Sequence, residues 1–130
     1  MKYDEFVGQV EHRARLASLG EATRAIHATL ETLGERLFGG EAANLAAQLP
    51  PELGQYLLQG GINESFDLDE FFARVSRREG VDLPLAVYHA RVVLEVLSEA
   101  VTPGLLNKVL AQLPDEYDRL IKAGSKGHLS

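Results

Sequence analysis

Two pairs of glutamates that recur at matched places along the chain have the clearest potential for chemistry. Glu31 and Glu35 lie four residues apart, and Glu95 and Glu99 repeat both positions 64 residues later. Carboxylates held in unlike environments can divide acid and base roles, because their pKa values are pushed apart. No serine, tyrosine or histidine is duplicated beside them. We therefore expect these glutamates to neutralise arginines of neighbouring helices or to face water, with acid–base chemistry as the alternative.

A second group of residues is basic and indicates anion binding. Arg13 and Arg15 stand at the end of the first predicted helix, and Arg77 and Arg78 end its counterpart in the second half. Cations in the last turn offset the partial negative charge of a helix end, and this local role is the alternative interpretation. If the two helix ends meet, however, their four guanidinium groups form a patch that can hold phosphate or carboxylate. The predicted partner is thus a small anionic ligand or another protein.

Metal binding is the remaining chemistry that the residue spacing permits. His27 and Glu31 are four residues apart and share one helix face, so both could reach one ion. The matched residues in the second half are Arg91 and Glu95, which have the spacing of a salt bridge. Phosphate-loop, dinucleotide, nucleophile-elbow and zinc-protease motifs are also missing from the sequence. We predict no metal site, no cofactor and no catalytic residue, which favours a protein that is not an enzyme.

These matched positions belong to an internal repeat. The segment 47–53 recurs 64 positions later as 111–117, with Gln48-Leu49-Pro50 matching Gln112-Leu113-Pro114. An offset of 65 aligns the earlier segment 4–6 with 69–71, so one residue was gained or lost between positions 14 and 18. We interpret the pattern as a duplication. Further identities at the offset of 64 are Ala22/Ala86, Leu30/Leu94, Leu33/Leu97 and Gly40/Gly104.

Apolar residues recur every three or four positions through both halves, which predicts helices and no half-buried strand. Three helix starts are indicated by typical capping residues: Ser18, which has Glu21 three positions later, Asp82, and Thr102. The helix that begins near Asp82 has almost no polar face, so we expect it at the centre of the bundle. The predicted helices cover about 4–17, 18 to the break at 39–40, 41–49, 51–59, 67–78, 82–101, 103 to the next proline, and 114–123.

The predicted fold is an all-α helical bundle built from two tandem four-helix repeats related by a pseudo-twofold. A unit of about 64 residues is marginal alone, so the two repeats should share one core. We therefore predict a single domain over 1–130. It consists of repeat 1 at about 3–59, a linker at about 60–66, repeat 2 at about 67–123, and a frayed tail at 124–130.

Composition limits the class of partner. The 130 residues include 13 Lys and Arg against 19 Asp and Glu, a formal charge of −6 that disfavours nucleic acid. No apolar run approaches the roughly 18 residues that cross a bilayer, and no signal peptide follows the charged opening, so we expect a cytoplasmic protein without a membrane partner. The sequence has no cysteine, which excludes disulfides and thiolate chemistry.

Several of these segments together resemble a known family. They are the helix start at Asp4-Glu5-Phe6, the Leu-x-x-Leu-x-Glu of 30–35, the Gly-Gly-Glu-Ala of 39–42, and the repeated Gln-Leu-Pro-x-Glu. From about residue 3 to 121 the chain resembles the bacterial family called domain of unknown function 2267. The resemblance implies a helical prokaryotic protein, and it carries over no catalytic residues because the family has no established activity. The second half departs from the pattern at Pro103-Gly104-Leu105, so only the first half would serve if that helix end binds a ligand.

The sequence therefore favours a non-enzymatic binding or regulatory module that uses its surface or a groove between the repeats. The alternative is a small-molecule enzyme with the duplicated glutamates in a crevice between the repeats. A filled core with an exposed groove would favour the first, and an enclosed pocket with a strongly perturbed carboxylate the second.

Overall fold

The computed structural model describes residues 1–60 and 63–123, and this part of the chain forms eight α-helices and no strand. The all-helical class predicted from the apolar periodicity is confirmed for these residues. The predicted tail at 124–130, and positions 61–62 of the predicted linker, lie outside the described residues. The helices are α1 (Tyr3–Arg13), α2 (Leu19–Arg36), α3 (Glu41–Ala47), α4 (Pro51–Leu58), α5 (Leu68–Glu79), α6 (Leu83–Ala100), α7 (Pro103–Ala111) and α8 (Asp115–Ala123).

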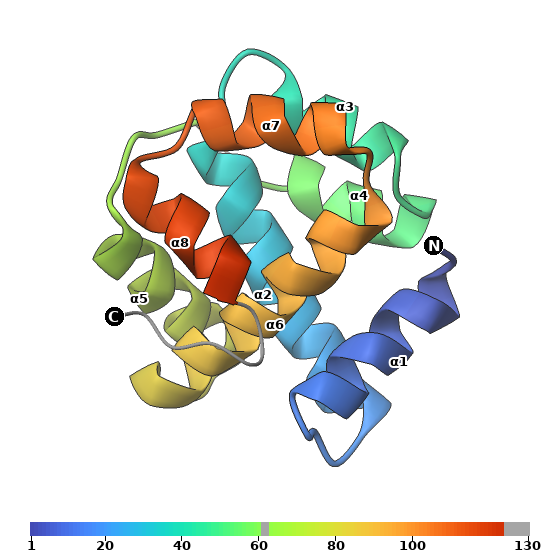
Figure 1. The fold of residues 1–130 in the computed structure, drawn as a ribbon. Coiled ribbons are helices and arrows are strands. Elements are labelled where there is room, and N and C mark those ends of the chain that lie inside the picture. Colours follow the sequence, from blue (N-terminus) through green and yellow to red (C-terminus); the bar gives the residue numbers. More distant parts are fainter. Residues whose placement is uncertain (61–62, 124–130) are drawn as a thin grey trace.

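The two long helices, α2 and α6, lie in the middle of the arrangement (Figure 1). α6 packs against α1, α2, α5 and α8, so its predicted central position is confirmed. α2 shares that position, since it packs against α1, α4, α5 and α6. α3 and α7 lie side by side at one end of the molecule. No helix within the described ranges is both long enough and apolar enough to cross a membrane.

The helices begin at the polar residues expected from the sequence. The hydroxyl of Ser18 accepts a hydrogen bond from the backbone N–H of Glu21 at 3.2 Å, and Asp82 and Thr102 accept in the same way at the starts of α6 and α7. The carboxylate of Glu21 in turn accepts from the backbone N–H of Ala17 at 2.8 Å. Each contact satisfies an N–H that has no partner within the helix, which fixes where the helix starts.

The end of α1 differs from the prediction. The helix ends at Arg13, rather than near residue 17, because Arg15 adopts a left-handed backbone with φ +55°. The N–H groups of Arg15 and Leu16 then bond back to the carbonyls of His12 and Glu11, which closes the helix end. The residue at the matched position of α5 is Gly80, with φ +77°. Glycine adopts this backbone at little cost, whereas arginine rarely adopts it, so the sequence pattern alone indicated only the second ending.

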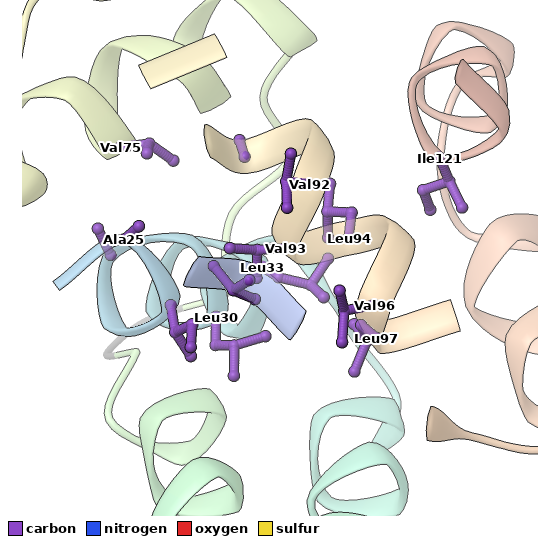
Figure 2. Packing of buried hydrophobic residues seen from close by; sticks show 14 of the residues in the cluster. Ala25, Leu30, Leu33, Val75, Val92, Val93, Leu94, Val96, Leu97 and Ile121 are labelled. Carbon is purple, nitrogen blue, oxygen red and sulfur yellow. The ribbon is translucent and has the colours of Figure 1, made fainter. Parts of the chain in front are cut away.

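Buried apolar side chains from all eight described helices form one cluster. Leu33 of α2 and Val93 of α6 are among the side chains directed into it (Figure 2). The cluster extends to the outer helices through Phe6 of α1, Phe71 of α5 and Tyr117 of α8, each at most 1% exposed. α2 and α6 thus carry the apolar faces against which the other helices pack.

Close backbone approach positions the segment after α4. A Cβ on Gly34 would lie 2.0 Å from the carbonyl oxygen of Leu57, so only glycine permits this spacing between α2 and α4. The chain then returns along α2, where the N–H of Glu64 donates to the carbonyl of Glu35 at 2.8 Å. The described part of the predicted linker therefore packs on α2.

We expect Arg15→Gly to stabilise the protein by about 1 kcal/mol, because it removes the cost of a left-handed non-glycine residue. The matched change Gly80→Ala should destabilise by a similar amount, since a Cβ there meets no atom within 4 Å and only the backbone conformation is penalised. Urea unfolding of both variants measures the two effects. Shifts of the same sign would contradict this explanation of where α1 ends.

Leu33→Ala and Leu97→Ala should each destabilise the protein by about 2–5 kcal/mol, because these matched leucines are only 1% and 3% exposed. The control is Leu58→Ala, at a leucine that is 58% exposed, and its cost should stay within about 0.5 kcal/mol. Chemical denaturation followed by circular dichroism gives all three values. A loss below about 0.5 kcal/mol at either core leucine would show that its site tolerates the cavity.

Candidate functional site

Arg13, at the end of α1, binds the two glutamates of α6. Its Nη1 donates to Glu95 at 2.7 Å and to Glu99 at 2.8 Å, and its Nη2 donates to the other oxygen of Glu99 at 2.8 Å. The contact with Glu99 is therefore bidentate, the geometry in which guanidinium and carboxylate groups fit best. Tyr88 adds a hydrogen bond of 2.7 Å from its hydroxyl to the carbonyl of Arg13. The end of α1 is thus attached to α6 at two points.

Arg78, at the end of α5, makes the corresponding contact with α2. Its Nη1 and Nη2 donate to the two oxygens of Glu35 at 2.7 Å each, and its Nε lies 3.7 Å from Glu31. Arg74, one turn earlier, also reaches Glu35 at 3.3 Å. Arg13 and Arg78 match at an offset of 65, as the glutamates match at 64. The prediction that the duplicated glutamates neutralise arginines of neighbouring helices is confirmed.

These arginines keep Glu35 and Glu99 ionised. Burial raises the pKa of Glu35, but the hydrogen bonds and positive charges of Arg78 and Arg74 outweigh burial and leave the pKa below its ordinary value. The hydrogen bond from Arg13 is the main reason that the pKa of Glu99 is also lowered. A glutamate with a lowered pKa is a poor proton donor near neutral pH. The contacts therefore suit a structural role better than acid–base chemistry.

The four arginines of the predicted anion site have different partners. Arg13 and Arg78 lie against glutamates, and the exposed Arg77 is 3.6 Å from Glu70. The guanidinium of Arg15 has no hydrogen bond or ion pair with any described residue. Arg15 is thus the member of the predicted set whose guanidinium has no partner among the described residues. Anion binding by the set stays a prediction.

The repeated Gln-Leu-Pro motif provides a second matched contact between the halves. The side chain of Gln48, after α3, accepts from the N–H of Thr102 at 2.8 Å. The side chain of Gln112, after α7, accepts from the N–H of Phe38 at 2.9 Å and donates to its carbonyl at 2.8 Å. Both glutamines and both backbone partners match at the offset of 64. Each glutamine therefore holds the segment that precedes α3 or α7 of the opposite half.

A cavity of about 310 Å³ lies where the ends of α1 and α5 meet the first turns of α2 and α6. Its lining includes the segment 14–17 after α1, Arg24 of α2, Glu79 at the end of α5, and Tyr88 and His89 of α6. The two helix ends that carry the predicted arginines therefore face one space. The guanidinium of Arg24, like that of Arg15, has no hydrogen bond or ion pair with a described residue. We call this space the inter-half cavity.

A buried acid–histidine pair forms part of the cavity wall. Nδ1 of His89 makes a short hydrogen bond with Oε2 of Glu79, and the two side chains are only 5% and 3% exposed. The other carboxylate oxygen, Oε1 of Glu79, is buried and has no hydrogen-bond partner among the described residues. Buried polar atoms are usually hydrogen-bonded, so an unpaired carboxylate oxygen on a residue that lines a cavity is unusual.

Comparison with known proteins identifies the family. A family model described as "Uncharacterized conserved protein (DUF2267)" matches residues 3–120. The chain belongs to the DUF2267 family. The resemblance drawn from the sequence motifs is therefore confirmed. Among curated proteins, none matches the chain.

The possible metal pair of this DUF2267 protein has other contacts. Nε2 of His27 hydrogen-bonds the side-chain oxygen of Gln59 at 2.7 Å, and its ring stacks on Tyr56 with centroids 4.1 Å apart. Glu31 is 3.5 Å from the same nitrogen. Within the described ranges, no group of three or more His, Asp and Glu side chains is arranged to hold a metal ion. His27 thus joins α2 to α4.

Sequence reasoning missed Arg24, Glu79 and His89 as site residues. The side chain of His89 is almost fully enclosed. A comparison of the halves contains the missing signal, because matched positions hold Glu79 against Ala14 and His89 against Ala25. A polar pair that interrupts an otherwise apolar matched face is unusual in a core. In this DUF2267 chain such departures mark the cavity.

We expect Glu35→Gln to destabilise the protein by about 1–3 kcal/mol at pH 7, because it weakens charge-assisted hydrogen bonds of a side chain only 13% exposed. The folded-state pKa of Glu35 is lowered, so its contribution is present above the ordinary value of 4.5 and is lost as pH falls through the lowered value. The difference in unfolding free energy between wild type and variant should therefore shrink below about pH 4.5.

The matched control for Glu35→Gln is Glu99→Gln, whose carboxylate is 47% exposed. Its cost should stay below about 1 kcal/mol, because solvent screens an exposed pair. Urea unfolding from pH 3 to 7 measures both variants. A difference between wild type and Glu35→Gln that does not change with pH would contradict the role assigned to the Arg78 contact.

Proposed function

We propose that this protein is a non-enzymatic binding module made of two copies of one four-helix unit, related by a pseudo-twofold and sharing one domain. The reciprocal contacts support this arrangement. Arg13 binds α6 as Arg78 binds α2, and Gln48 and Gln112 each hold the opposite half. Each of these four contacts thus has a counterpart at the matched positions. The single apolar cluster supports a common core.

In this proposal the module binds a small ligand with a carboxylate or phosphate group in the inter-half cavity. The observation that carries the proposal is the pair Arg15 and Arg24, two guanidinium groups that line one cavity and have no partner among the described residues. Free guanidinium groups hold oxyanions through bidentate hydrogen bonds. Arg13 and Arg78 are already bound by glutamates, so they support the walls and leave ligand contact to the other two.

The enzyme hypothesis has less support. It requires the duplicated glutamates to exchange protons with a substrate, yet Glu35 and Glu99 are held ionised by bidentate arginines. In addition, none of the four duplicated glutamates lines the inter-half cavity. We further propose that the protein acts in the bacterial cytoplasm, with a small ligand or another protein as partner. Its charge of −6 argues against nucleic acid.

Isothermal titration calorimetry at low salt tests the proposed function with two probes, inorganic phosphate and 4-methylpentanoate. We expect saturable binding of at least one probe, weakened by added salt because exposed guanidinium groups are screened. Arg24→Gln should reduce the affinity by about tenfold or more, as expected when one charge-assisted contact is lost.

The matched control is Arg119→Gln on α8. It removes the same charge from an exposed residue that does not line the cavity. Its affinity for both probes should stay within about twofold of wild type, since a distant exposed charge is screened. Failure of both probes to bind, or equal losses in the two variants, would refute a binding site at the inter-half cavity.

A further inference from the structure

The cationic side of the inter-half cavity comes from the first half of the chain. Arg15 follows α1 and Arg24 lies on α2, and both line the cavity. The matched positions in the second half are Gly80 and Tyr88, which carry no charge. Arg15 adopts a left-handed backbone conformation, which glycine would adopt at a lower cost in free energy. Strained residues of this kind concentrate at functional sites. The cavity therefore has one wall suited to an anionic group.

The second half contributes an acid to the lining of the same cavity. Glu79 ends α5 and is paired with His89 of α6, and both residues line the same cavity. At the matched positions the first half has Ala14 and Ala25. The two halves thus present different chemistry to one space. The first half contributes Arg15, Arg24 and Glu21, and the second half contributes the buried carboxylate of Glu79.

The carboxylate of Glu79 has one oxygen without a hydrogen-bond partner in the described part of the chain. His89 occupies Oε2 of Glu79, while Oε1 is buried without any partner among the described residues. A buried carboxylate oxygen strongly favours a donor, and a charged donor such as an ammonium group makes the strongest hydrogen bond to it. A ligand that brings only negative charge into the cavity would leave this oxygen unpaired and would be repelled by it.

The charged groups of the lining balance one another. Two arginines, Arg15 and Arg24, face two glutamates, Glu21 and Glu79, so the sum of their formal charges is zero. A cavity with this balance is complementary to a ligand that is itself neutral overall but carries both charges. A phosphate or a plain carboxylate matches only the two arginines.

We propose that the inter-half cavity binds a small amino acid-like zwitterion, with its carboxylate on Arg15 and Arg24 and its ammonium group on Glu79. This inference rests on the proposed function and specifies the ligand class. The volume of about 310 Å³ is at the lower end for ligand pockets, which suits one small molecule. Val81 and the half-exposed Leu85 also line the cavity and provide an apolar surface for an aliphatic side chain.

Three probes of matched shape separate the charges: L-leucine, 4-methylpentanoate without the amine, and 3-methylbutylamine without the carboxylate. Titration of the full chain, followed by calorimetry and by NMR shifts, should give an affinity for leucine about tenfold or more above that of either single-charge probe. Glu79→Gln should bring leucine down to the affinity of 4-methylpentanoate. Arg24→Gln should weaken both carboxylates and leave the amine within about twofold, and Arg119→Gln should change none of them.

The outcomes separate this inference from the proposed function. If 4-methylpentanoate binds as tightly as leucine, the zwitterion is refuted while the anion site stands. If none of the three probes binds and phosphate also fails, both proposals are refuted. If Glu79→Gln does not fold, the comparison of the three probes on the wild-type chain still decides the question.

Discussion

The packing of α2 against α6 is the contact on which the rest of the structure depends. α6 presents apolar side chains on almost every side, so its stability requires cover from several helices at once. Some of that cover comes from the other half of the chain, because α1 packs on α6 and α5 packs on α2. Neither half therefore encloses its own long helix. The apolar cluster becomes continuous only when both halves are present.

This arrangement creates an electrostatic requirement that the arginines meet. Two central helices that are covered by neighbours leave their glutamates beside packed surface, where an unpaired charge is costly. Arg13 and Arg78 bring a bidentate guanidinium to each pair from the helix that crosses over it. Such contacts contribute little when solvent screens them, but they specify where α1 and α5 rest on their partners. Gln48 and Gln112 do the same for the backbone at the other end.

The same crossing brings the ends of α1 and α5 to one place and leaves the inter-half cavity between them. The walls are matched in position but differ in residue type. If the chain arose by duplication, the packing contacts were retained in both copies while the cavity residues diverged. Such divergence would give a space lined by unlike residues, which a perfectly symmetric dimer would not provide.

Much of the fold could be predicted from the sequence, because the signals involved are local. Apolar spacing predicts the helices, and the caps at Ser18 and Asp82 predict where α2 and α6 begin, since both depend on groups within one turn. The charge pattern of the helices also predicted that the duplicated glutamates would neutralise arginines of neighbouring helices or face water. The end of α1 was misplaced because Arg15 occupies a left-handed position that usually signals itself by glycine.

Only the tertiary structure decided which charges meet and which stay free. The pattern of apolar residues indicates which face of each helix is polar. The partner of Arg13, however, depends on how α1 crosses α6, because Glu95 lies 82 residues away in the sequence. The same crossing encloses Glu79 with His89 and leaves Arg15 and Arg24 at a common cavity. By itself the sequence determined the helices, their apolar faces and the matched halves. The site depended on the relative placement of distant helices, because side chains act on one another through space.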